Sequence, residues 1–215
     1  MKIQLTQKYL SFIIVVMSLV YLISCQKEEN KTTSAIIYTD IIPDTIVTSF
    51  ALNDLYVETY NLDLDKDGAY DFRFKYKFIF GVQCRPTGSY GYKIYIEVEP
   101  ADDSFNEILN VVYPALSDTL PAALDTLYEI GSVSGEWLSS PSQLLRYVNS
   151  CCCSRGDYFL HNNDKYLGLK LVKNSQAFYG WARLNGNYWD GTPLLLKDYA
   201  YNSSPNEFIL AGQRE

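Results

Sequence analysis

The chain has 215 residues, of which 47% are hydrophobic, and its formal net charge is −7. That share of apolar residues is enough for a packed core, so the composition excludes disorder for most of the chain. The acidic balance argues against a nucleic-acid binder, which needs clustered Lys and Arg. Because the chain has a single His, most histidine-based metal sites are excluded as well.

The first 24 residues have the pattern of an export signal. Lys2 and Lys8 precede an apolar stretch over residues 9–23, which only Ser11 and Ser18 interrupt. A charged start followed by a short apolar segment is typical of a secretory signal peptide. The stretch is shorter than the roughly 20 residues that a membrane-spanning helix needs.

The end of this stretch, Leu22-Ile23-Ser24-Cys25, resembles the lipobox of bacterial lipoproteins. The resemblance implies that the chain is cut before Cys25, that this residue carries fatty acids, and that the lipid binds the protein to a membrane. Two or three acyl chains hold a protein to a bilayer almost permanently. The alternative is an ordinary cleaved signal or a single membrane span, in which Cys25 has no such role.

Residues 25–34 are polar and lack periodicity, which predicts a flexible tether. The pair Glu28-Glu29 resembles the surface-export signal of bacteroidete-type lipoproteins. This resemblance implies an outer-membrane anchor with the domain on the cell surface, and the periplasmic face is the alternative. We therefore expect a signal peptide over 1–24, a tether over 25–34 and a single domain over 35–215.

The domain is dominated by two-residue alternation, which is typical of half-buried strands. The clearest cases are residues 70–80 and 92–98, the latter ended by Pro100. Ten short strand candidates with turn residues between them predict an all-β fold, an antiparallel β-sandwich of jelly-roll-like type. The other eight candidates are residues 36–41, 45–52, 55–62, 108–113, 166–172, 177–184, 194–201 and 208–210.

One segment predicts a helix instead. Ser140-Pro141 has the pattern of a helix start, and Leu144, Leu145 and Val148 share one helical face. We expect a short helix over 142–149 at an edge of the sheet.

Between two strand candidates lies the segment Asp63-Leu64-Asp65-Lys66-Asp67-Gly68-Ala69-Tyr70-Asp71. Alternating carboxylates with a Gly at the sixth position let a loop curl around a hard cation. The spacing predicts a structural calcium site formed by the carboxylates of Asp63, Asp65, Asp67 and Asp71 and the carbonyl of Ala69. The segment resembles the DxDxDGxxD loops at hairpin tips of secreted proteins. The alternative is a plain turn with solvated aspartates.

The cysteines other than Cys25 are Cys84 and the run Cys151-Cys152-Cys153. An exported protein meets oxidising conditions, so we expect one or two disulfides among these four residues, with free thiols as the alternative. A zinc site with His161 is disfavoured, because adjacent ligands converge poorly on one tetrahedral ion.

Aromatic residues gather near Asn185-Gly186-Asn187, and they are Tyr179, Trp181, Tyr188 and Trp189. Exposed Tyr and Trp rings stack on sugars or anchor partner proteins, so this group is a candidate ligand platform. The alternative is that the rings fill the core. The sequence contains no GxSxG, HExxH, P-loop or GxGxxG motif, and Glu97 and Glu99 are best explained as solvated acids of one strand.

The C-terminal segments "YGW" (residues 179–181), "DYAY" (198–201) and "ILAGQ" (209–213) resemble a recurrent ending of secreted bacterial β-proteins. The resemblance implies a surface β-sandwich and supplies no catalytic residues. We expect a lipid-anchored surface protein of binding or scaffold type that recognises a glycan or an envelope protein and binds no nucleic acid. The alternative is a surface hydrolase acting on polysaccharide or peptide.

Overall fold

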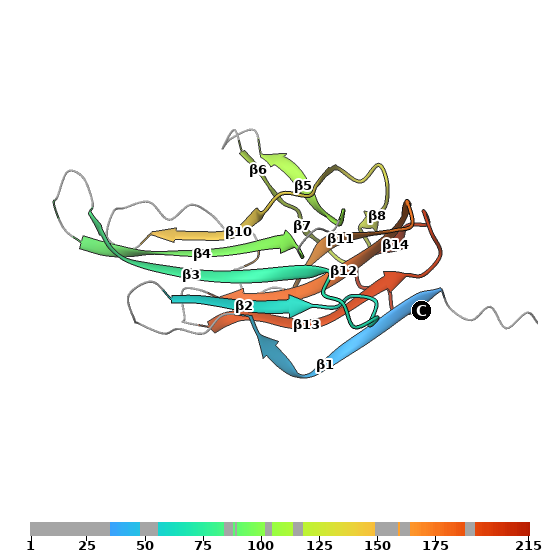
Figure 1. Cartoon of the computed structure of the whole chain (residues 1–215), viewed down its shortest axis with the longest axis horizontal. Helices are drawn as coiled ribbons and strands as arrows, with labels where there is room; N and C mark the ends of the chain where they lie inside the picture. The colour runs from blue at the N-terminus through green and yellow to red at the C-terminus, as the bar shows by residue number, and fades with distance from the viewer. Residues whose placement is uncertain are drawn as a thin grey trace, which may run out of the picture. The chain divides into compact units, whose positions relative to one another are not determined.

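Within the residues that the structure describes, every regular element is a strand and every pairing is antiparallel (Figure 1). Two sheets share one apolar core, so the predicted antiparallel β-sandwich is confirmed. The described residues belong to one compact unit, Ser34–Glu215. The structure is a computed structural model, and it describes residues 35–47, 56–83, 88, 90–101, 105–113, 118–148, 159, 164–187 and 192–215.

The smaller sheet has four strands, in the order β10 (Ser142–Val148), β4 (Tyr90–Pro100), β3 (Phe72–Gln83) and β2 (Tyr56–Leu62). The larger sheet runs β1 (Ile36–Ile46), β13 (Thr192–Asn202), β12 (Gln176–Asn187), β11 (Lys165–Lys173), β5 (Glu107–Tyr113) and β6 (Asp118–Pro121). Two short strands extend it, β7 (Ala123–Leu124) beside β11 and β9 (Glu136–Leu138) beside β5. A separate pair joins β8 (Glu129–Ile130) to β14 (Ile209–Leu210).

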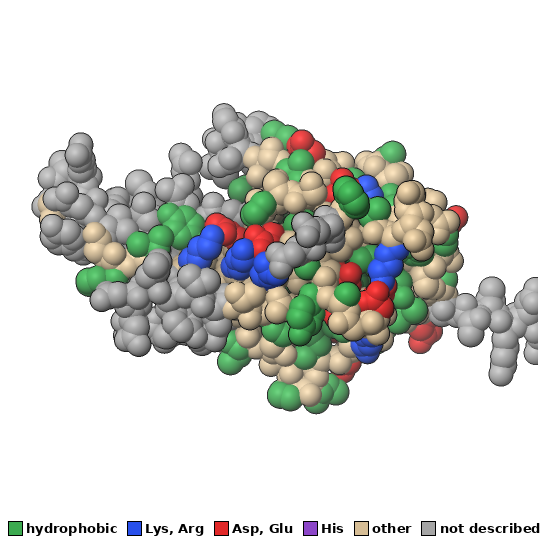
Figure 2. Space-filling view, in the orientation of Figure 1, with side chains coloured by type: hydrophobic (Ala, Val, Ile, Leu, Met, Phe, Trp, Pro, Cys, Tyr) green, Lys and Arg blue, Asp and Glu red, His purple; other side chains and the backbone are tan. Residues whose placement is uncertain are grey.

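Strand β3 shows the alternation that the sequence predicts. Phe72 and Phe74 are buried, whereas Arg73 and Lys75 lie on the opposite face and pair with Glu99 of β4 at 3.2 Å and 2.5 Å. Cross-strand pairs of opposite charge stabilise the exposed face of a sheet modestly. Figure 2 shows basic side chains next to acidic ones on this side of the molecule, so neither sign of charge gathers alone there.

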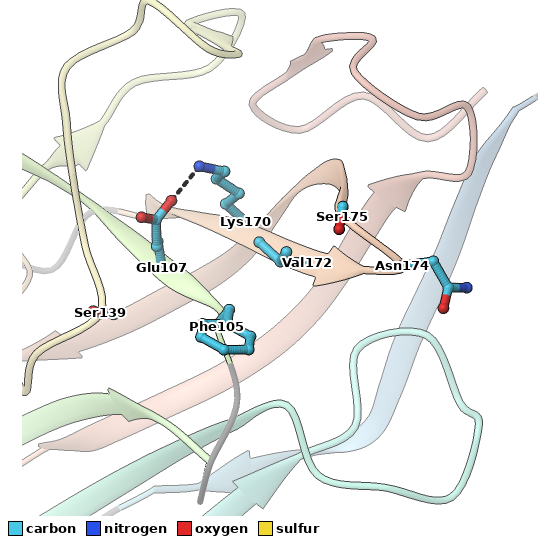
Figure 3. A pocket seen from close by; sticks show the side chains of 7 residues that line it. All are labelled: Phe105, Glu107, Ser139, Lys170, Val172, Asn174 and Ser175. Atoms are coloured by element: carbon cyan, nitrogen blue, oxygen red, sulfur yellow. Dashed lines mark hydrogen bonds and ion pairs between the residues drawn. The ribbon is translucent and has the colours of Figure 1, made fainter.

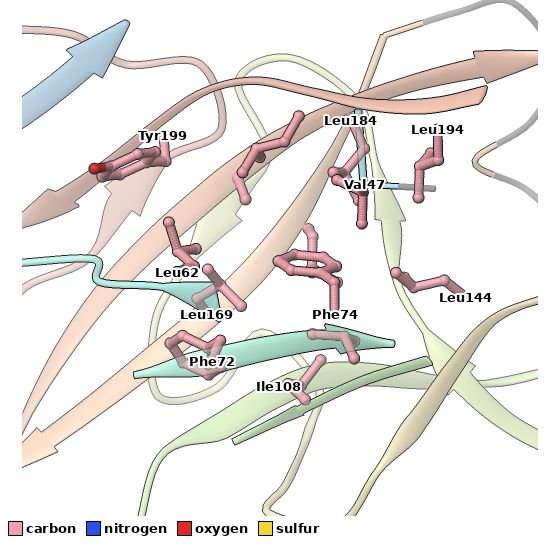
Figure 4. Packing of buried hydrophobic residues seen from close by; sticks show 14 of the residues in the cluster. Val47, Leu62, Phe72, Phe74, Ile108, Leu144, Leu169, Leu184, Leu194 and Tyr199 are labelled. Carbon is pink, nitrogen blue, oxygen red and sulfur yellow. The ribbon is translucent and has the colours of Figure 1, made fainter. Parts of the chain in front are cut away.

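The core between the two sheets is aliphatic and aromatic, and Figure 4 shows members of it from both sheets. Burial of each such side chain contributes about 1.5–3 kcal/mol, so this layer is the main reason that the sheets stay together. Its buried members include Phe72, Phe74, Ile96 and Val98 from the smaller sheet and Leu167, Leu169, Leu171, Leu184 and Leu196 from the larger one.

The larger sheet is buried on its other face as well. Residues 122–130 and 209–211 cover this face, and Trp181 is fully buried beneath them, with its ring centroid 5.2 Å from that of Tyr166 in an edge-on contact. Alternate residues of β12 therefore fill two cores, with Ala182 facing the smaller sheet and Trp181 facing the covering segments. Two-residue alternation predicts only one buried face per strand.

The predicted helix over 142–149 is wrong, because residues 142–148 form strand β10. This strand pairs with β4, where Ser142 lies opposite Val98, and it places Leu144 in the core at 4% exposure. Pairing with β4 satisfies the backbone donors and acceptors and buries the leucine, which outweighs a local preference for helix.

The other predicted strands lie close to the observed ones. The prediction of 166–172 corresponds to β11, which covers 165–173, and that of 194–201 corresponds to β13, which covers 192–202. The segments predicted separately at 36–41 and 45–52 share strand β1 as far as residue 46. Strands β6 to β9, which have two to four residues each, were not predicted.

Candidate metal-binding loop

The loop of residues 63–71 connects β2 to β3 and is shaped by its own carboxylates. Gly68, at a φ of 93°, adopts the left-handed conformation that glycine accepts without strain. Its N–H donates to Asp63 Oδ2 at 2.9 Å, and the N–H of Ala69 donates to Asp67 Oδ1 at 2.8 Å. These bonds curl the chain of the loop back on itself.

Three of the predicted ligands converge. One carboxylate oxygen each from Asp63, Asp65 and Asp71 lies within 4.8 Å of the other two. The Asp71 side chain is buried and accepts a hydrogen bond from the N–H of Leu64 at 2.7 Å. Among the described atoms, Asp63 Oδ1 is buried and accepts no hydrogen bond, so one oxygen of this group is open to a ligand.

The loop disfavours the charged form of the Asp71 carboxylate. Burial is the main cause that raises the pKa of Asp71 to about 6, and the negative charges of Asp65 and Asp63 add to the effect. The hydrogen bond from Leu64 acts in the opposite direction. A cation among these oxygens would remove the repulsion.

The fourth predicted carboxylate, Asp67, lies outside the converging group and faces Lys173 at the end of β11, with 2.6 Å between Asp67 Oδ2 and Lys173 Nζ. Lys173 also forms an ion pair with Asp65. Burial alone would lower the pKa of Lys173, but these two hydrogen bonds hold it above its usual value. Lys173 thus ties the loop, which belongs to the smaller sheet, to the larger sheet.

The donor set fits a hard divalent cation. Ca²⁺ takes six to eight oxygen ligands from carboxylates, carbonyls and water, and its geometry tolerates an irregular loop. Asp63, Asp65 and Asp71 supply carboxylate oxygens without any nitrogen or sulfur donor in the group. Such a set does not suit zinc or copper, which prefer histidine and cysteine.

The candidate ligand platform is corrected by the structure. Tyr179 and Trp181 are 3% and 0% exposed and belong to the second core, beneath the segments 122–130 and 209–211. The Tyr179 ring packs on that of Trp137, with 5.5 Å between centroids. These two rings therefore cannot stack on a ligand at the surface. They point away from the core between the two sheets, but the second core covers them on the other face of β12. Tyr188 and Trp189 lie outside the described residues.

Several other predicted positions also lie outside the described residues. They are the signal and tether over 1–34 with Cys25, the four remaining cysteines Cys84, Cys151, Cys152 and Cys153, and His161. The lipid anchor and the disulfides accordingly stay predictions.

Glu97 and Glu99 have partners across the smaller sheet. Lys77 pairs with Glu97 at 2.5 Å, and Lys75 pairs with Glu99 at the same distance. These acids contribute to the charged face of a strand pair, as expected.

Two polar groupings were not anticipated from the sequence. One is a cleft of about 580 Å³ beside β5 and β11, lined by Phe105, Glu107, Ser139, Lys170, Val172, Asn174 and Ser175 (Figure 3). The other is a buried network around Asp198. No local motif marks either, since their members come from separate segments of the chain.

Comparison of the chain with protein-family models, with curated proteins and with solved structures finds no match. In the described part of the chain, no helix has the length and apolar character that crossing a membrane requires.

Proposed function

We propose that the protein is a calcium-stabilised, lipid-anchored protein of the cell envelope that binds or scaffolds a glycan or an envelope protein. The observation that carries the calcium role is the convergence of Asp63, Asp65 and Asp71 within 4.8 Å. The buried, unpartnered oxygen of Asp63, within the described residues, supports the same role. The lipobox at Cys25 supports the anchor.

The calcium role is structural. The loop joins β2 to β3, and the N–H of Asp71 donates to the carbonyl of Leu62 at 2.8 Å where the two strands begin to pair. A cation held by Asp63, Asp65 and Asp71 would fix this end of the hairpin and its register. It would also offset the negative charges of Asp65 and Asp63, which add to the effect of burial on the pKa of Asp71.

The calcium role predicts a change in melting temperature. Loops of this kind in extracellular modules bind Ca²⁺ with dissociation constants of about 10⁻⁴–10⁻³ M. At 10 mM CaCl₂ we expect about 1.4–2.7 kcal/mol of stabilisation, which corresponds to a rise of about 3–10 °C for a domain of this size. The measurement is differential scanning calorimetry in CaCl₂, in MgCl₂ and after chelation with EGTA.

Two variants control this experiment. Asp63→Asn removes a converging carboxylate and should abolish the calcium-dependent rise, whereas Asp44→Asn, which changes an exposed carboxylate of β1, should leave the rise intact. A melting temperature that calcium does not move, or an equal rise in Asp63→Asn, shows that the loop is only a turn.

The anchor is tested by metabolic labelling with a fatty-acid probe. Wild-type protein should incorporate the label and sediment with membranes, and Cys25→Ala should do neither, because the residue that carries the lipid is missing. Equal labelling of Cys25→Ala contradicts the anchor and leaves the calcium role untouched.

The hydrolase alternative has no supporting observation among the described residues. Their one group of three converging carboxylates is the calcium-loop candidate, and Glu97 and Glu99 are engaged by lysines. Binding or scaffolding is therefore the role that we carry forward.

A further inference from the structure

The cleft beside β5 and β11 is distinct from the aspartate loop and has the size of a small-molecule site. Its volume is about 580 Å³, and pockets for small ligands typically measure about 300–1,000 Å³. Figure 3 shows Val172 between the Lys170–Glu107 pair and the turn at Asn174 and Ser175, and Phe105 on the near side.

Phe105 supplies an apolar surface to this cleft. Its side chain is 80% exposed, although burial of a Phe ring contributes about 1.5–3 kcal/mol and most such rings are covered. An exposed ring beside polar groups offers a flat face to the C–H groups of a ligand. The neighbouring Asn106 is buried and accepts a hydrogen bond from the N–H of Val172 at 2.8 Å, which fixes the backbone beside Phe105 against β11.

Lys170 and Glu107 supply a donor and an acceptor at neighbouring positions. They lie opposite each other in the pairing of β11 with β5 and form an ion pair. The Lys170 ammonium also lies 5.8 Å from the centre of the Trp137 ring, which holds it in place from another side. An ammonium has three protons and a carboxylate about four acceptor sites, so each group keeps hydrogen-bonding capacity beyond this pair.

The far end of the cleft is a tight turn with polar side chains. Asn174 and Ser175 connect β11 to β12 with φ values of 50° and 62°. Glycine would adopt this conformation at lower cost, by about 1 kcal/mol per position. The chain instead carries an amide and a hydroxyl here, and both line the cleft.

We propose that this cleft binds a neutral sugar unit of a glycan. The single lysine and the single glutamate cancel in charge, so the cleft does not favour an ionic ligand. Adjacent sugar hydroxyls both donate and accept, and can therefore satisfy Glu107 and Lys170 together, while the C–H face of the ring packs on Phe105. This inference rests on the binding role proposed above and gives it a location and a ligand class.

The test uses the full-length protein on an array of neutral and acidic oligosaccharides, followed by calorimetry with cellobiose, maltose, mannobiose and lactose. We expect at least one neutral saccharide to bind. Phe105→Ala should weaken its affinity about tenfold, and Lys170→Gln at least fivefold, with melting temperatures close to that of the wild type. Phe208→Ala is the matched control, because it removes an exposed ring that does not line the cleft.

Several outcomes overturn the inference. They are the absence of binding to any neutral saccharide, binding only to acidic glycans or to peptides, or unchanged affinity in both cleft variants. The calcium melting experiment on the same sample keeps the two proposals separate. A protein stabilised by Ca²⁺ that binds no saccharide loses the sugar site alone, and one that binds saccharide but ignores Ca²⁺ loses the calcium role alone.

Discussion

Asp198 is a fully buried carboxylate on β13, and four hydrogen bonds from three side chains reach it. Arg183 donates twice, at 2.7 Å and 2.6 Å, while Tyr38 donates at 2.8 Å and Arg214 at 3.0 Å. A buried charge is tolerable only when it is paired in this way. The carboxylate thereby joins β1, β12 and the C-terminal segment at one point.

Removal of this charge should destabilise the protein strongly. In Asp198→Asn the Arg183 guanidinium stays partly buried without its main counter-charge, so we expect the free energy of unfolding to fall by about 3–5 kcal/mol. Urea denaturation followed by circular dichroism measures the change. Asp164→Asn is the control, because Asp164 contacts the same guanidinium at 3.0 Å but is 30% exposed, and it should cost less than about 1 kcal/mol.

The hydroxyl of Tyr38 should lose its proton at a higher pH than an ordinary tyrosine does. Burial and, after it, the hydrogen bond to Asp198 together raise the pKa of Tyr38 to about 12. Because the folded-state pKa lies above the usual value of 10.0, this tyrosine contributes stability that is complete below pH 10 and is lost as the pH rises toward 12. A tyrosinate absorbance titration of wild type against Tyr38→Phe should reveal one residue with a midpoint near 12. A midpoint near 10 for that residue contradicts the burial of its hydroxyl beside Asp198.

At the scale of elements, strand β14 closes the second core. Ile209 and Ala211 are fully buried against the larger sheet, and the Ile130–Ile209 register holds β14 to β8. In β12, a Cβ at Gly180 would meet the backbone oxygen of Ala200 at 2.7 Å, so only glycine permits this spacing between β12 and β13. Close packing, more than strand length, keeps these elements in place.

Two neighbouring substitutions test this closure. Ile209→Ala leaves a cavity in the second core, and we expect a loss of about 2–5 kcal/mol in the free energy of unfolding. Phe208→Ala, one residue earlier and 48% exposed, should cost less than about 1 kcal/mol. Guanidinium denaturation of both variants gives the comparison. Equal losses would show that residues 208–210 do not pack as described.

The sequence predicts long strands well and short ones poorly, for a physical reason. In β3, aromatic residues at alternate positions predict one buried face, and Phe72, Phe74 and Tyr76 are buried as predicted, whereas Phe80 near the end of the strand is 61% exposed. Strands of two residues, such as β7 and β8, have no period to detect and exist because β11 and β14 offer them hydrogen-bonding partners. Strand β10 also depends on its neighbour. Its residues have a pattern that predicts a helix, but pairing with β4 makes them a strand.

At the scale of the whole molecule, Asn106 links the two sheets. Its amide donates to the carbonyl of Asp71 at 3.2 Å, next to β3, and accepts from the N–H of Val172 in β11 at 2.8 Å. The side chain is 2% exposed, so its removal leaves buried polar groups unsatisfied. Asn106 therefore holds the backbone of the aspartate loop at Asp71 and the backbone of the cleft at Val172.

Asn106→Ala should therefore affect stability and both sites. We expect the free energy of unfolding to fall by about 1–3 kcal/mol in urea denaturation. The calcium-dependent rise in melting temperature should also shrink, because Asp71 loses a neighbour that positions its backbone. An unchanged calcium response with reduced stability would show that Asn106 supports the fold and not the loop.

The two sites differ in how far the sequence reveals them. The aspartate loop is contiguous, so its spacing predicts that Asp63, Asp65 and Asp71 converge. The place of Asp67, which faces Lys173 instead, is invisible from the spacing because Lys173 lies 106 residues further along the chain. The cleft combines residues of the segments 105–107, 139 and 170–175 from three parts of the chain, and only the pairing of β5 with β11 brings Glu107 to Lys170.

The pairing of β1 with β13 has a consequence for how the chain reaches this state. Tyr38 and Asp198 are 160 positions apart, and synthesis at about 5–20 residues per second separates their appearance by roughly 8–30 s. During that interval β1 is a nascent strand without its partner, carrying the side chains of Tyr38 and Ile41, which pack against the cores only in the folded protein. Long-range strand pairing of this kind folds slowly, and until it forms, the unpaired edge of β1 exposes the newly made chain to aggregation.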